Sequence, residues 1–97
     1  MRPTITPETR VVVSPDQVSC DLAGEAAILN LKNSLYYGLD PVGARIWNLM
    51  RTPTTVSALR DRILQEYDVD AARCEKELVT LLSTLAAEGL VEVETMG

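Results

Sequence analysis

Few side chains in this chain are able to act as nucleophiles, general bases or metal ligands. The two cysteines, Cys20 and Cys74, lie far apart, and the sequence contains no histidine. A zinc site or a redox motif needs closely spaced cysteines, and histidine is the usual base for a nucleophile and the commonest metal ligand. We also find no paired carboxylates and no phosphate-binding loop. We therefore expect two reduced, partly buried thiols, no cofactor and no catalytic activity.

Charge and composition exclude further classes of function. Nine basic residues against fourteen acidic ones give a net charge of −5, which opposes binding to a polyanion. No apolar run approaches the roughly 20 residues that span a bilayer, and the N-terminus lacks the apolar stretch of a signal peptide. The chain should therefore be cytoplasmic, with neither nucleic acid nor membrane as a partner. A chain of 97 residues forms one domain, and we expect a flexible arm over 1–10 and a single domain over 11–97.

Alternating residues in the first part of the chain predict strands. Residues 25–39 read as a hairpin with its turn at Asn33-Ser34. Its expected apolar face consists of Ala27, Leu29, Leu31, Leu35, Tyr37 and Leu39. Short strands over 11–13 and 18–22 precede it, so the first forty residues should form a small antiparallel meander. Gly38 indicates either a site where a Cβ would obstruct something or a simple bend.

Three helices should follow, each with its own start signal. Asp40-Pro41 combines a capping side chain with a proline at the first helical position, and Thr55 and Asp70 are further candidate caps. Gly89 can end the third helix in a left-handed conformation. The expected helices are 42–50, 56–67 and 71–88, and the last strand is 90–94. This order predicts an α+β, winged helix-turn-helix-like fold, with an N-terminal three-stranded antiparallel sheet followed by three helices.

The third helix is apolar over more than one face. Its main stripe consists of Cys74, Leu78, Leu81 and Leu85, and further apolar residues, Ala71, Val79, Leu82 and Ala86, lie outside that arc. Either the helix is buried on two sides, or one flank forms the wall of an open groove.

Residues 29–47, LNLKNSLYYGLDPVGARIW, carry a more specific resemblance. An aliphatic strand, a basic turn, an aromatic pair, Gly-Leu-Asp-Pro-Val-Gly and Ile-Trp follow in the order typical of the PqqD family. Its members are recognition elements for ribosomally made peptides, and this chain is most similar to the leader-binding proteins of lasso-peptide pathways. Many relatives would carry Asn where this chain has Asp40, and both residue types cap helices. The resemblance extends from about Val18 to Val91.

The resemblance implies a groove between the third helix and the last strand of the meander, in which a leader peptide adds as a strand. Ser34 to Gly38 would be the receiving edge, and Lys32 and Arg73 would pair with acidic leader residues. The expected peptide-binding residues are Lys32, Ser34, Leu35, Tyr36, Tyr37, Gly38, Arg73, Glu75, Leu78, Val79 and Leu82.

The resemblance also implies partners. These are the leader peptide of a lasso-type precursor, a transglutaminase-like leader protease, and the asparagine-synthetase-like cyclase as a further candidate. An alternative is a peptide chaperone for a radical-SAM or other modifying enzyme, and a generic protein-interaction module is also compatible with the residues. A DNA-binding winged helix is disfavoured, because the third helix opens with Glu75 and Glu77 and the last strand offers no basic wing.

Overall fold

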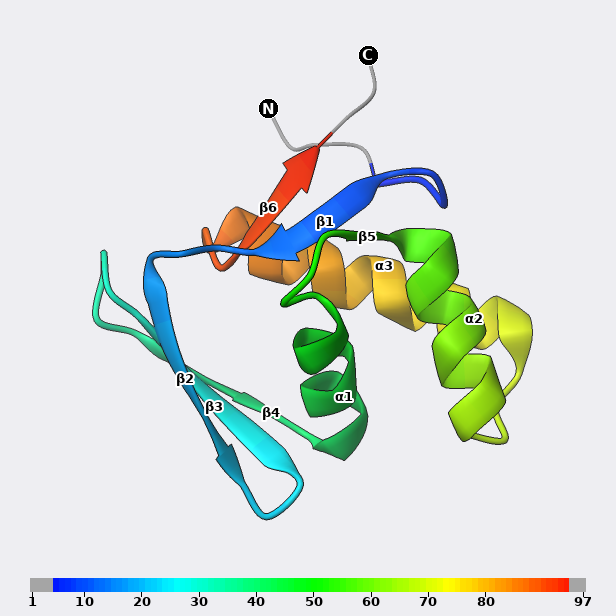
Figure 1. The fold of residues 1–97 in the computed structure, drawn as a ribbon, viewed down its shortest axis with the longest axis horizontal. Coiled ribbons are helices and arrows are strands. Elements are labelled where there is room, and N and C mark those ends of the chain that lie inside the picture. The colour runs from blue at the N-terminus through cyan, green and yellow to red at the C-terminus, as the bar shows by residue number, and fades with distance from the viewer. Residues whose placement is uncertain (1–4, 95–97) are drawn as a thin grey trace.

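The structure is a computed structural model that describes residues 5–94, with six strands and three helices in that range. Figure 1 shows their arrangement. In chain order the elements are β1 (Arg10–Val13), β2 (Gln17–Leu22), β3 (Glu25–Asn30), β4 (Tyr36–Leu39), α1 (Pro41–Leu49), β5 (Thr54–Thr55), α2 (Val56–Glu66), α3 (Ala71–Ala87) and β6 (Val91–Glu94).

The strands form two antiparallel sheets, in the orders β2-β3-β4 and β5-β1-β6. The first is the N-terminal three-stranded sheet expected ahead of the helices, so the α+β, winged helix-turn-helix-like class is confirmed. The expected four-strand meander is wrong, because β1 leaves it and lies between β5 and β6 (Figure 1). Val11 pairs there with Val93 and is 1% exposed. A run of three valines suits such a central strand, which is apolar on both faces.

The inner face of the β2-β3-β4 sheet is the reverse of the expected one on β3. Ala26, Ile28 and Asn30 are buried, whereas Leu29 is only half-buried. Both sets of alternate residues on β3 are apolar enough to face a core, so the pattern alone does not fix the face. Asn30 determines which face of β3 points inwards. Its Nδ2 donates to the Glu88 carbonyl over 2.6 Å and so anchors β3 to the end of α3. On β4 the expected inner residues, Tyr37 and Leu39, do face inwards.

The three helix starts match the sequence prediction. The side chains of Asp40, Thr55 and Asp70 accept hydrogen bonds from backbone N–H groups in the first turns of α1, α2 and α3, over 2.7, 3.2 and 3.0 Å. Such caps satisfy N–H groups that have no partner within the helix. Gly89, with φ of +75°, follows α3 as expected and turns the chain into β6.

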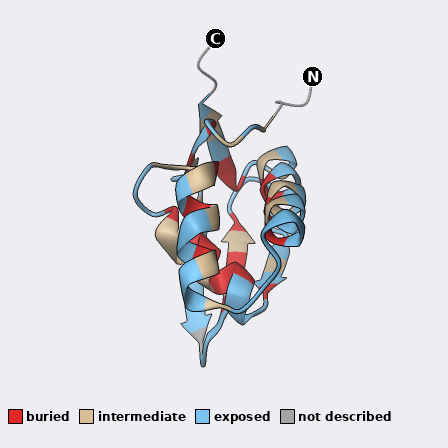
Figure 2. Cartoon of the chain, turned by 90° about the vertical axis from the view of Figure 1, so that its right-hand side faces the viewer, coloured by how far each residue is buried: buried red, intermediate tan, exposed pale blue. Residues whose placement is uncertain are grey.

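The core lies between the helices and the inner faces of both sheets. Trp47, Met50, Leu59, Leu82 and Leu90 are among its fully buried side chains. Each helix has buried and exposed residues, as expected for amphipathic helices around one core, and Figure 2 shows this for the helices nearest the viewer. No helix in the described part of the chain is long and apolar enough to cross a membrane.

Residues just before β1 contact the start of α2. The N–H groups of Val56 and Ser57 donate to the carbonyls of Thr9 and Pro7 over 3.0 and 2.9 Å, and Thr9 is 4% exposed. Pro7 and Thr9 of the expected 1–10 arm thus contact the folded domain, and the flexibility of that arm stays a prediction. Residues 1–4 of that arm lie outside the described range.

Candidate functional site

Strand β4 is an open edge of the β2-β3-β4 sheet. It pairs with β3 on one side, and among residues 5–94 no strand pairs with its other side. The strand covers Tyr36 to Leu39, so only part of the expected 34–38 edge is strand. Ser34, with φ of +60°, and Leu35 lie in the preceding turn, which a Ser34 N–H to Asn30 carbonyl bond of 2.8 Å closes. An edge of this kind presents unpaired N–H and C=O groups to an incoming extended chain.

A cleft of about 740 Å³ lies beside the C-terminal half of this edge. It is formed by the end of β4, the start of α1, the α2–α3 connection and the N-terminal two-thirds of α3. The lining residues are Gly38, Leu39, Asp40, Val42, Gly43, Ile46, Ile63, Asp68, Val69, Asp70, Arg73, Cys74, Glu77, Leu78 and Leu81.

The floor of the cleft is apolar and its rim is charged. Ile46, Ile63, Cys74 and Leu78 are each at most 8% exposed, whereas the Arg73 side chain is exposed and pairs with Glu77 over 3.0 Å. Burial, and then the nearby Glu77 carboxylate, raise the pKa of the Cys74 thiol, which therefore stays protonated at neutral pH. A cleft with this lining can hold an apolar side chain.

The other end of the gap between β4 and α3 is closed by a hydrogen bond. The Tyr37 hydroxyl donates to Glu88 Oε2 over 2.6 Å, and this bond, followed by burial, raises the pKa of Tyr37. Neither residue lines the cleft, whose lining stops at Gly38 on β4 and Leu81 on α3. The Tyr37–Glu88 bond thus fixes the spacing of β4 and α3 where the cleft ends.

Three of the expected peptide-binding residues line the cleft, namely Gly38, Arg73 and Leu78. The other expected α3 residues, Glu75, Val79 and Leu82, do not line it. Glu75 pairs with Arg60 of α2 over 3.5 Å, and Val79 and Leu82 pack into the core, Leu82 with no exposed area. On α3 the cleft is lined by the expected Arg73 and Leu78 together with Cys74, Glu77 and Leu81.

The apolar cleft residues that sequence reasoning missed include Val42 and Val69. They remain 37% and 47% exposed although each lies within two residues of a capping aspartate at a helix start. An apolar residue next to a cap is usually read as a local packing contact, so its exposure becomes visible only in the fold.

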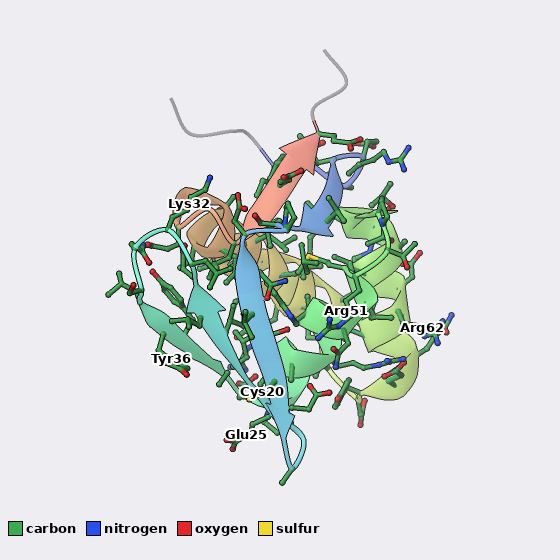
Figure 3. The ribbon with its side chains drawn as sticks, turned by 60° about the vertical axis from the view of Figure 1, so that its left-hand side comes forward. Cys20, Glu25, Lys32, Tyr36, Arg51 and Arg62 are labelled. Carbon is green, nitrogen blue, oxygen red and sulfur yellow. The ribbon has the colours of Figure 1, made fainter. Side chains whose placement is uncertain are left out.

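The outer face of the β2-β3-β4 sheet carries a second apolar surface. Val18, Leu29 and Tyr36 are in register across its three strands, and Leu31 and Leu35 lie in the turn between β3 and β4. We call Val18, Leu29, Leu31 and Tyr36 the outer patch. Val18, Leu31, Leu35 and Tyr36 are 56%, 54%, 51% and 72% exposed, and Figure 3 shows Tyr36 pointing away from the helices.

Lys32, in the turn beside the outer patch, lies 3.3 Å from Asp16 with its side chain 73% exposed. Of the further expected residues, Tyr36 thus belongs to the outer patch, Lys32 borders it, and Leu35 lies exposed in the turn before Tyr36. Within residues 5–94 no group of His, Cys, Asp or Glu is arranged to hold a metal ion.

An open sheet edge over an apolar cleft places this chain among small winged-helix domains with a surface suited to an extended ligand. The chain belongs to the PqqD family: the family model for coenzyme PQQ synthesis protein D (PqqD) matches residues 25–91. A comparison with curated proteins finds no match.

Two solved structures resemble the chain. TbiB1 in complex with the TbiA(beta) leader peptide is 36% identical, with a TM-score of 0.78 over 84% of this chain and 94% of that one. A lasso peptide synthetase B1 complexed with the leader peptide is 16% identical, with a TM-score of 0.74 over 84% of this chain and 96% of that one. The second likeness concerns the fold alone.

Proposed function

We propose that this chain is a non-catalytic recognition element that binds the leader peptide of a lasso-type precursor by strand addition at β4 and presents it to a leader-cleaving protease. The observation that carries this proposal is the unpaired β4 edge directly beside the apolar cleft. The 36% identical TbiB1 structure, which contains a leader peptide, supports the same class of ligand. This role belongs to the cytoplasm, where ribosomally made precursors are synthesised.

Strand addition at this edge supplies affinity in two parts. Each backbone hydrogen bond to β4 contributes about 0.5–1.5 kcal/mol, and these bonds do not depend on the sequence of the peptide. An apolar side chain buried against Ile46, Ile63 and Leu78 contributes roughly 1.5–3 kcal/mol and provides discrimination. After the cost of association, a few such contacts are compatible with an affinity near 1 μM, which corresponds to about −8.2 kcal/mol.

The expected binding residues take different roles in this proposal. Gly38 supplies the edge, Leu78 the floor, and Arg73 a cation at the rim for an acidic leader residue. Glu75, Val79 and Leu82 support the site only by holding α3 in place, because their contacts are with α2 and the core.

Presentation to the protease needs a second surface that the bound leader leaves free. The part of the outer patch that lies away from the β4 edge, with Val18 on β2, provides one, since it lies on the face of the sheet opposite the helices and exposes apolar side chains. Contiguous exposed apolar residues commonly mark protein interaction sites. A protease held there would meet the leader at a high effective concentration, and the cyclase is a further candidate for the same surface.

The binding step is tested by titration calorimetry of the chain with the leader segment of the precursor encoded beside its gene. The intact leader should bind with micromolar or tighter affinity, and a scrambled leader should bind much more weakly. Equal affinities for the two peptides would contradict specific recognition.

The presentation step is tested by the rate of leader cleavage at low precursor concentration. Val18→Glu, on the β strand farthest from the β4 edge, should leave leader binding unchanged and slow cleavage. Ser83→Glu, on an exposed position of α3, is the matched control and should affect neither. If the protease cleaves the leader at the parent rate in the presence of Val18→Glu, it does not dock on the outer patch.

A further inference from the structure

Gly38 stands at a position in β4 where the fold has room for a side chain. A Cβ built on Gly38 would meet no atom within 4 Å, and the positive-φ glycines of the described chain are Gly24 and Gly89. Gly43 differs, because its Cβ would lie 3.2 Å from the Asp40 carboxylate. A glycine inside a strand lowers stability relative to alanine. The free chain therefore gives no reason for Gly38, neither an obstruction nor a bend.

The direction in which the missing side chain would point is fixed by the strand. Successive residues of a strand face opposite sides, and Tyr37 and Leu39 both face the core. Position 38 consequently faces the outer side of the sheet, where its register partner is Ala27. Tyr36, on the same side and 72% exposed, is its neighbour along the strand. Gly38 and Ala27 together leave a low area next to a large aromatic ring.

Backbone pairing with an added peptide does not by itself need a glycine, because paired strands everywhere carry side chains that stand out of the sheet. In an ordinary antiparallel pair, the Cβ atoms of directly opposite residues lie about 4.5–5.5 Å apart. A glycine has no Cβ and therefore leaves space for the side chain of the residue opposite it on the added strand. Aromatic side chains are the ones that cover glycines in sheets well. The exposed Tyr36 ring offers such a side chain an offset aromatic contact.

We propose that Gly38 is a second specificity site for the bound peptide, which receives an aromatic side chain on the outer face of the sheet against Ala27 and Tyr36. This inference rests on the proposed strand addition at β4. It predicts that neighbouring peptide residues are read on opposite faces: one enters the cleft between β4 and α3, and the next covers Gly38. The recognised motif is then an apolar anchor adjacent in sequence to an aromatic residue.

A random peptide library displayed on its encoding RNA and selected on the full parent chain provides the probe. The selected peptides should share an aromatic residue next to an aliphatic one. The tightest peptide is then titrated against Gly38→Val and against the control Cys20→Val. The control places the same valine side chain on the outer face, two strands away from the edge. Gly38→Val should melt at or above the parent temperature and bind at least tenfold more weakly, whereas Cys20→Val should bind like the parent.

A double-mutant cycle ties the effect to the aromatic residue. Replacing that residue of the peptide by Ala should weaken binding to the parent chain about tenfold and should weaken binding to Gly38→Val little further. If Gly38→Val binds like the parent, or if the two losses multiply independently, the Gly38 site is wrong while strand addition stands. If the parent chain selects no peptide at all, strand addition itself is contradicted, and the Gly38 site with it.

Discussion

The two faces of the β2-β3-β4 sheet carry similar apolar residues but differ in how far these residues are buried. The inner face buries Ala26 and Ile28 completely or nearly so, whereas the outer face leaves Val18 and Tyr36 56% and 72% exposed. Both faces are apolar enough to be buried, and only one of them has helices of this chain packed against it (Figure 1). The difference indicates that the inner face stabilises the fold and that the outer face is available to another molecule.

The β4 strand joins these two functions. Its inward residues contact the core and α3, its outward residues belong to the exposed face, and its free edge runs between them. A peptide added to β4 would extend both faces at once, because its side chains alternate as those of β4 do. Substitutions in the cleft or at Gly38 should therefore change binding, whereas a substitution at Val18, two strands away from the edge, should change presentation alone.

The largest expected effect is a loss of stability from a substitution on the inner face of the β2-β3-β4 sheet. Ile28→Ala should lower the free energy of unfolding by about 2–5 kcal/mol, because Ile28 has no exposed area and the cavity is enclosed by core. Leu29→Ala, one residue along and on the outer face, should cost less than about 1 kcal/mol. Urea denaturation of both variants measures the contrast, and equal losses would mean that the outer face is covered in solution.

The two flanks of α3 should separate binding from stability. Leu81→Ala removes an apolar wall of the cleft and should weaken leader binding about tenfold, which corresponds to roughly 1.4 kcal/mol. Val79→Ala, on the flank that packs into the core, should reduce stability and leave the affinity within about twofold. Calorimetric titration of the two variants with the leader compares their affinities. A larger affinity loss in Val79→Ala would place the peptide on the opposite flank of the helix.

Sequence reasoning predicted the helices well because their start signals are local. Asp40, Thr55 and Asp70 cap N–H groups no more than three residues away, so the chain itself holds the evidence. The face of β3 was predicted wrongly because it depends on Asn30 reaching Glu88, which is 58 residues distant. A polar residue that is buried by a partner so far along the chain gives no local sign of its burial.

The site was predictable to a similar extent. The β4 edge, Gly38 and Leu78 follow from strand order and from the resemblance, and they do line the cleft or its edge. The flank of α3 was not predictable, because Leu81 and Leu82 differ by about 100° around a helix and both are apolar. Packing in the core buries Leu82 completely and leaves Leu81 in the cleft wall, and no spacing in the sequence distinguishes the two.

A smaller effect is expected at the closed end of the gap between β4 and α3. The hydrogen bond to Glu88 raises the pKa of Tyr37 above its usual 10.0, so folding favours the protonated phenol. This contribution is fully present below pH 10 and disappears as the pH rises through the raised pKa of the folded chain. Tyr37→Phe should therefore lower stability at neutral pH and lose less of it between neutral and alkaline pH than the parent does. Tyr36→Phe, on the exposed face of the same strand, should behave like the parent in melting curves recorded over that range.

The smallest effect should come from an exposed ion-pair network that connects α1 to α2. Glu66 accepts hydrogen bonds from Arg45 Nε and Nη2, both over 2.8 Å, and from Arg62 Nε over 3.0 Å. The Arg45 bonds, and then that of Arg62, lower the pKa of Glu66 from 4.5 to about 2. Since the folded pKa lies below the unfolded one, the network stabilises the fold above about pH 4.5, and this contribution is lost as the pH falls towards 2. Water and salt screen so exposed a network, so its contribution should be modest and should shrink further at high ionic strength.

Glu66→Gln should accordingly lower the melting temperature slightly at pH 7 and leave it nearly unchanged at pH 2, relative to the parent. Glu92→Gln, which removes one carboxylate from an exposed position of β6, is the matched control for the change in net charge. A pH-independent deficit in Glu66→Gln would show that the carboxylate acts through packing and not through its charge, and the connection between α1 and α2 would then owe nothing to the ion pairs.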